Sequence, residues 1–162
     1  MISRIFLCFV LTLIVCVAVE AVQVYNYNVT VKTADSPNFS SHKGKLKLAV
    51  FSIDQYAKSR EDYVLTPYNV KLAKSHFYTA SIASFASLKN MTSVYLRWTL
   101  ASPYNPYYLM KKPSIYFEPI IFNSTYIDPK THMLVTKSRK FCPLTTPVQI
   151  KHGNGSSFYP CV

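Results

Sequence analysis

Glycine is scarce in this chain of 162 residues, and its scarcity restricts the possible chemistry. Only three glycines are present, so a Gly-x-Ser-x-Gly nucleophile elbow is absent from the sequence. The run Gly153-Asn154-Gly155 resembles a fragment of a phosphate-binding loop, but only seven residues follow it, too few for the helix that such a loop needs. We predict instead that this run is a turn that carries a glycan.

Metal ligands are also sparse. The four histidines lie far apart and show neither i,i+2 nor i,i+4 spacing, so a zinc site would exist only if folding assembled it. The seven Asp and Glu residues are thinly spread, and a calcium cluster would have to combine Glu61 and Asp62 with Asp35 or Asp54. We therefore expect no metal, no cofactor and no catalytic residues, and we predict that the protein is not an enzyme.

The first residues form the one long apolar run. Arg4 precedes apolar residues 5–19, and Val19-Glu20-Ala21 ends the run with a small residue, a pattern typical of a signal peptide. The alternative is a membrane anchor, but this run is shorter than the roughly 20 residues that a spanning helix needs. We predict a signal peptide at residues 1–21 and one secreted, extracellular domain at residues 22–162.

Two further patterns agree with secretion. Cys8 and Cys16 lie in the predicted signal peptide, so Cys142 and Cys161 are the pair that meets the oxidising compartment. We expect these two to form a disulfide, the alternative being free or metal-bound thiols. Five Asn-x-Ser/Thr sequons predict N-glycosylation, at Asn28, Asn38, Asn90, Asn123 and Asn154.

Basic residues outnumber acidic ones. The chain has 18 Lys and Arg against 7 Asp and Glu, a formal net charge of +11, and removal of Arg4 and Glu20 with the signal peptide leaves that charge unchanged. Such a surface attracts anions, which outside the cell are sulfated glycans and anionic lipid headgroups rather than nucleic acid. The basic residues are scattered, so simple solubility is the alternative role for this charge.

Period-two alternation of apolar and polar residues predicts strands at residues 25–32, 45–50 and 93–100. Weaker strands are predicted at residues 62–65, 77–84, 115–123, 133–141 and 148–151. Eight short strands without alternating helices favour an all-β, eight-stranded antiparallel β-sandwich or barrel. In this assignment Asn28 points outward from a strand, Asn90 precedes a strand, and the other three sequons fall in turns.

The segment after the last of the three strong strands is the best candidate for a binding site. Pro103, Pro106 and Pro113 remove backbone donors, so residues 101–113 are predicted to be a connection rather than a central strand. Exposed apolar clusters usually mark a binding surface, and tyrosine suits a boundary between water and lipid. The alternative is that the connection folds back and caps the core. We predict contact with lipid or a partner through Tyr104, Tyr107, Tyr108, Leu109, Met110, Lys111 and Lys112.

Four segments stand in a recognisable order: Tyr27-Asn28-Val29-Thr30-Val31, residues 46–52, residues 88–98 ending in Trp98, and Lys140-Phe141-Cys142 followed by Cys161. Together they resemble the carboxy-terminal PLAT domain of the pancreatic-lipase and lipoprotein-lipase family. The resemblance implies an eight-stranded PLAT/LH2-like β-sandwich, with a lipid-contacting loop after the tryptophan strand. It also implies a disulfide between the last strands, which Cys142 and Cys161 match.

The chain departs from that family in three ways. Its loop offers tyrosines where the lipoprotein-lipase loop is rich in tryptophan, and a glycine that commonly follows the second strand is absent near Ser52 and Ile53. A signal peptide also stands where a lipase has its catalytic domain. We therefore expect a secreted, non-catalytic module that contacts lipid surfaces or a lipid-associated protein. The alternative is a cationic extracellular glycoprotein that binds sulfated glycans or a protein partner.

Overall fold

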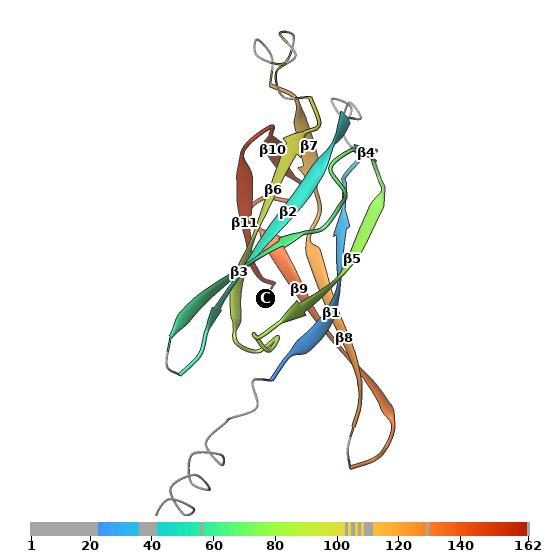
Figure 1. Cartoon of the computed structure of the whole chain (residues 1–162), viewed down its shortest axis with the longest axis vertical. Coiled ribbons are helices and arrows are strands. Elements are labelled where there is room, and N and C mark those ends of the chain that lie inside the picture. Colours follow the sequence, from blue (N-terminus) through green and yellow to red (C-terminus); the bar gives the residue numbers. More distant parts are fainter. Residues whose placement is uncertain are drawn as a thin grey trace, which may run out of the picture.

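The computed structural model describes residues 23–35, 42–55, 57–102, 104, 106, 108, 112–128 and 130–161. The predicted signal peptide and the sequon at Asn38 lie outside the described residues. The described elements are strands, which confirms the all-β class (Figure 1). They are β1 (Tyr25–Lys32), β2 (His42–Ile53), β3 (Lys58–Val64), β4 (Val70–Leu72), β5 (Phe77–Ser84), β6 (Met91–Leu100), β7 (Ser114–Phe117), β8 (Ile120–Ile127), β9 (Leu134–Pro143), β10 (Val148–Lys151) and β11 (Gly155–Pro160).

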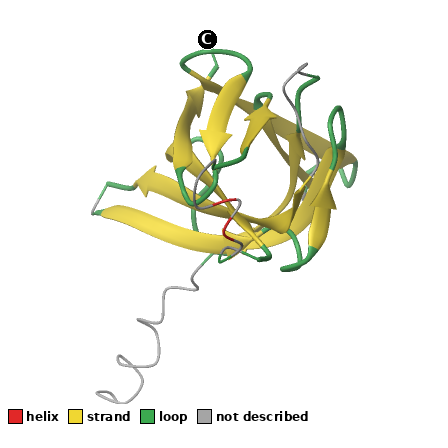
Figure 2. Cartoon of the chain, turned by 90° about the horizontal axis from the view of Figure 1, so that it is seen from above, coloured by secondary structure: helices red, strands yellow, loops and turns green. Residues whose placement is uncertain are grey.

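Eight strands form one antiparallel path in the order β3-β2-β6-β11-β9-β8-β1-β5, and β4 pairs with β2 beside this path. The short strands β10 and β7 form a second, two-stranded sheet. Seen from above, the large sheet curves around the core and is nearly closed (Figure 2). This arrangement confirms the predicted eight-stranded antiparallel sandwich or barrel.

Side chains join the two end strands of the large sheet, β3 and β5. The Tyr63 hydroxyl donates a hydrogen bond to the Ala83 carbonyl at 2.8 Å. The Glu61 carboxylate accepts a hydrogen bond from the Phe85 N–H at 3.1 Å and also contacts the Tyr63 hydroxyl. The seam between β3 and β5 is therefore held by side chains of β3 rather than by a ladder of backbone hydrogen bonds.

The alternation in the sequence explains how the core is built. Strands β1, β2 and β6 each bury every second residue, so that one face of each strand lies inside. The indole of Trp98 on β6 is fully buried, and its Nε1 donates a hydrogen bond to the Ile150 carbonyl of β10 at 2.7 Å. This bond ties the small sheet to the large one, and it confirms that Trp98 points inward.

The predicted strand at residues 115–123 is two strands in the structure. Pro119 lies between β7 and β8, which belong to different sheets, and a proline has no N–H with which to continue a ladder. The prediction that Asn123 lies in a turn was wrong, because Asn123 lies within β8 and pairs with Asn28 of β1. The polar residues that follow it, Ser124 and Thr125, suggested a turn, but they continue β8 and pair with β9.

Two strands, β4 and β11, were not predicted from the sequence. Strand β11 lies between β6 and β9, although its residues include only one fully buried aromatic ring, that of Phe158. It begins at Gly155, where an added Cβ would lie 2.5 Å from the Tyr95 ring and 2.6 Å from the Leu96 carbonyl oxygen. A glycine is therefore required for β11 to approach β6 at this point.

The predicted disulfide is present. Cys142 of β9 is bonded to Cys161, which follows β11, and their Cα atoms are 5.1 Å apart. The bond fastens two neighbouring strands where their pairing ends. Within the described ranges, no helix is long and apolar enough to cross a membrane.

Candidate functional site

The predicted contact segment lies between the end of β6 at Leu100 and the start of β7 at Ser114. Of the seven predicted contact residues, the structure describes Tyr104, Tyr108 and Lys112. Tyr107, Leu109, Met110 and Lys111 lie outside the described residues. Pro106 and Tyr108 have helical conformation, which appears as a short stretch in red (Figure 2).

Tyr104 and Lys112 present their side chains to solvent. The Tyr104 side chain is 88% exposed, and Lys112 is exposed as well. An aromatic ring in this position buries apolar area only when something docks on it. The described part of the contact segment thus offers one free ring and one free cation.

Tyr108 is half-buried and packs against the core. Its ring meets the His42 ring edge to face, with centroids 5.6 Å apart, and His42 stacks on Trp98 at 6.2 Å. Burial lowers the pKa of His42, so this ring is held in its neutral form. Tyr108 therefore anchors the base of the contact segment. The sequence analysis gave Tyr108 the same role as Tyr104, because a contact between Tyr108 and the distant His42 cannot be read from the sequence.

His152 completes the support beneath the contact segment. Its Nδ1 accepts a hydrogen bond from the Leu100 N–H at 3.1 Å, and its ring lies 5.7 Å from that of Trp98. Burial, followed by the positive charges of Lys112 and Arg97, lowers the pKa of His152. A neutral imidazole is needed here, because a protonated Nδ1 cannot accept that hydrogen bond.

A second candidate surface is a basic hollow on the outer face of β2, β3 and β6. Lys47 of β2 lies directly opposite Arg97 of β6, although like charges in that position are destabilising. Arg60 also lines this hollow of ≈ 380 Å³, where Asp62 pairs with it at 2.9 Å. Within the described part of the chain, Lys47 and Arg97 have no acidic partner. The alternation predicted that both side chains point outward, but only the register places them side by side.

A third surface is the hairpin of β8 and β9, which projects at the end of the molecule opposite to the end of β6 (Figure 1). Ile127 and Leu134 are directly opposite each other across the two strands. Their side chains and that of Met133 are 65%, 71% and 66% exposed. Sequence reasoning did not single out this apolar hairpin, because its strands appeared weak and its end appeared to be an ordinary turn.

Four of the five sequons lie in the described residues. Asn28 and Asn154 are exposed, whereas Asn90 and Asn123 are half-buried. The side chain of Asn28 accepts a hydrogen bond from the Ser81 hydroxyl through Oδ1 at 2.7 Å, which leaves its amide nitrogen facing away from that bond. Because Asn28 and Asn123 are register partners, glycans on both would leave the sheet from adjacent positions.

The part of the chain that the structure describes holds no group of three His, Cys, Asp or Glu residues that are placed to share a metal ion. The acids considered for calcium, which are Glu61, Asp62, Asp35 and Asp54, each have other partners, and Asp35 pairs with Lys74 at 3.1 Å. Glu61 receives the Phe85 N–H, Asp62 pairs with Arg60, and Asp54 receives the Gln55 N–H at 2.7 Å.

No protein-family model matches this chain, and no curated protein is similar to it in sequence. Solved structures are similar in fold. Two crystal structures of deletion variants of a lipoxygenase match 86% of this chain, with TM-scores of 0.54 and 0.55 at 13% and 11% identity. A third, in complex with arachidonate, matches with a TM-score of 0.51 at 10% identity. This chain spans 17% of each lipoxygenase chain, so the likeness concerns the fold alone, and it fits a PLAT-like fold.

Proposed function

We propose that this protein is a secreted, non-catalytic binding module that contacts lipid surfaces through the contact segment, residues 104–112. The observation that carries the proposal is the 88% exposure of the Tyr104 ring beside a proline-rich connection. Tyrosine places an apolar ring in the lipid boundary while its hydroxyl stays in water. The exposed Lys112 adds attraction to anionic headgroups, worth about 1 kcal/mol per cation near a charged membrane.

We also propose that this domain is related to the carboxy-terminal domain of the pancreatic-lipase family, and two features of the fold support this relationship. The strand that carries Trp98 runs into the contact segment, and Cys142 is bonded to Cys161, as that likeness implies. The similar lipoxygenase structures include one in complex with arachidonate, a lipid. The sequons leave residues 93–121 without a glycan site, so sugars attached to the protein spare this segment.

Vesicle binding tests the proposal. We expect the protein to sediment with vesicles that contain anionic lipid, and replacement of Tyr104, Tyr107, Leu109 and Met110 by serine to lower the affinity about tenfold, because apolar area drives interfacial binding. Tyr108 is retained, since it packs on the core. The matched control replaces Ile127, Met133 and Leu134 by serine on the opposite hairpin and should leave binding unchanged. Absence of vesicle binding, or a larger loss in the control, contradicts the proposal.

The basic hollow favours a second candidate function, binding of sulfated glycans. Replacement of both Lys47 and Arg97 by glutamine is then expected to lower the salt concentration that elutes the protein from heparin, because screening weakens surface charge contacts. The control removes two exposed lysines elsewhere, Lys71 and Lys140, and should shift elution less. Equal shifts would show that net charge alone holds the protein on heparin.

A further inference from the structure

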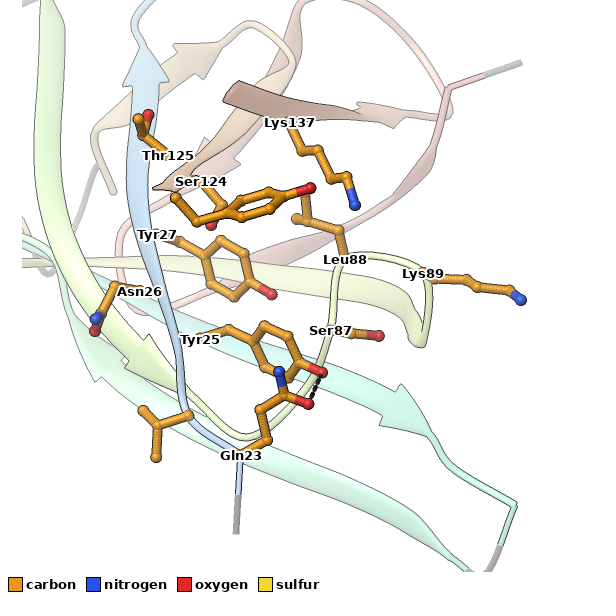
Figure 3. Close-up of a pocket in the computed structure, with 12 residues that line it drawn as sticks. Gln23, Tyr25, Asn26, Tyr27, Ser87, Leu88, Lys89, Ser124, Thr125 and Lys137 are labelled. Carbon is orange, nitrogen blue, oxygen red and sulfur yellow. Dashed lines mark hydrogen bonds between the residues drawn. The ribbon is translucent and has the colours of Figure 1, made fainter. Parts of the chain in front are cut away.

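A pocket opens at the end of the barrel that lies opposite to the contact segment. Its volume is ≈ 470 Å³, and it is walled by the start of β1, the connection between β5 and β6, and facing parts of β8 and β9 (Figure 3). Small-molecule sites measure roughly 300–1,000 Å³ and occur commonly in the mouths of β-barrels. The dimensions and the position of this pocket therefore fit a small ligand.

One wall of the pocket is a pair of tyrosine rings. Tyr25 and Tyr27 lie on the same face of β1, nearly parallel at 12°, with centroids 6.3 Å apart. Each hydroxyl donates within the protein, Tyr25 to Gln23 Oε1 at 2.8 Å and Tyr27 to the Ala86 carbonyl at 2.8 Å. Tyr27 is only 2% exposed and lies beneath this wall, whereas the half-buried Tyr25, whose hydroxyl is occupied, offers its ring as an apolar surface to a ligand. The spacing of the two rings is already that of a contacting pair, about 4.5–7 Å, so a ligand lies on the Tyr25 side of the pair and not between the rings.

The opposite wall is fixed by Arg139. Its guanidinium donates hydrogen bonds to the carbonyls of Leu88, Lys89 and Met91, which hold the connection before β6 in place. The side chain of Leu88 faces the two tyrosines across the pocket (Figure 3). Behind Tyr27, the ring of Phe122 packs edge to face at 6.0 Å, so the apolar wall rests on the core. Both walls are therefore formed before a ligand arrives, which lowers the cost of binding.

A single cation reaches into the pocket. The ammonium of Lys137 points into the space above the rings, whereas Lys89 extends away from it (Figure 3). Lys137 Nζ lies 5.0 Å from the centroid of the Tyr126 ring. The described residues that line the pocket include no Asp or Glu, although the charge of Asp128 outside it acts on Lys137. The pocket thus combines an apolar body with one positive group at its rim.

We propose that this pocket binds one molecule of a single-chain acyl amphiphile with an acidic head. The chain lies along Tyr25 and Leu88, with Tyr27 buried beneath them, and the carboxylate pairs with the Lys137 ammonium. A flexible chain can follow the apolar wall, and a monoanion complements the single cation. This site is separate from the vesicle-contact segment, because it lies at the other end of the barrel and takes a dissolved molecule.

Titration with dodecanoate below its micelle concentration, followed by calorimetry and by amide NMR shifts, tests the proposal. We expect one molecule to bind per chain, with shifts at Tyr25, Tyr27, Leu88 and Lys137. Lys137→Gln should weaken dodecanoate binding about tenfold and leave the binding of dodecanol unchanged, because charge-assisted pairing is lost. Leu88→Trp should abolish the binding of both compounds by filling the pocket.

Two controls distinguish binding in this pocket from general charge attraction and from binding at the contact segment. Lys140→Gln removes an exposed lysine from the same strand and should leave dodecanoate binding unchanged, as should serine substitution of the contact segment. The proposal is overturned if dodecanoate does not bind or if its shifts fall outside the pocket. An equal loss in Lys137→Gln and Lys140→Gln overturns it too, because general charge attraction would then account for the binding.

Discussion

Trp98 is the residue on which both sheets depend. Its indole is fully buried between the ring of His42 on one strand and that of His152 after another, and its Nε1 bonds to the small sheet. The same side chain supports the base of the contact segment through His42 and Tyr108. Structural and proposed functional roles therefore meet at one residue.

Replacement of Trp98 by phenylalanine should lower the free energy of unfolding by roughly 2–3 kcal/mol, because it leaves a cavity and an unpaired Ile150 carbonyl. Urea unfolding followed by far-UV circular dichroism measures the loss. Tyr104→Phe, at an exposed ring, is the control and should change stability by less than about 0.5 kcal/mol. Equal stability of the two variants would show that the indole hydrogen bond and its packing contribute nothing.

At the scale of elements, strand β11 holds the sheet together between β6 and β9. Its pairing with β9 is short and covers only Phe158, Tyr159 and Pro160. The disulfide between Cys142 and Cys161 lies beside this short ladder. A covalent link is thus placed beside a short stretch of backbone pairing.

Cys142 and Cys161 are 19 residues apart in sequence. Replacement of both by alanine should therefore destabilise the fold by about 3 kcal/mol, the value that the chain-entropy model gives for a loop of this size. Chemical denaturation of the variant, and of the native protein with and without a reductant, gives the measurement. Reduction of the native protein should reproduce the loss seen in the variant. A midpoint that neither change shifts would exclude a stabilising role for the bond.

The elements also show what the sequence can and cannot predict. Strands with regular alternation, such as β2 and β6, were predicted because burial on one face leaves a period-two pattern. Strand β11 was missed because its first three residues, Gly155-Ser156-Ser157, are small and show no apolar alternation, and its place in the sheet depends on the space that Gly155 provides. Of the candidate surfaces, the contact segment was visible in the sequence. The basic hollow and the barrel-end pocket were not, because pairing of distant strands assembles them.

For the whole molecule, buried tyrosines determine the response to alkali. Burial raises the pKa of Tyr27 to about 12, and burial also raises the pKa of Tyr63 and Tyr78 above the ordinary value of 10.0. In the unfolded chain these hydroxyls lose their protons near pH 10, whereas the folded chain retains them. The unfolded state then binds fewer protons, so stability is full below about pH 10 and falls as pH rises above it.

We predict that the free energy of unfolding falls between about pH 10 and pH 12, with Tyr27 contributing up to about 1.4 kcal/mol per pH unit. Urea midpoints measured across this interval test the slope. Tyr27→Phe should flatten it, although the variant is less stable at neutral pH because the bond to the Ala86 carbonyl is lost. Tyr104→Phe should leave the slope unchanged, and an equally steep slope in both variants would contradict the role assigned to Tyr27.

The position of β11 has a consequence for how the protein is made. The other strands precede it in the sequence, yet it fills the space between β6 and β9 in the middle of the large sheet. During synthesis the chain therefore emerges with two sheet edges exposed until β11 has left the ribosome. Closure of the large sheet therefore has to wait until β11, the last of the described strands, has been made.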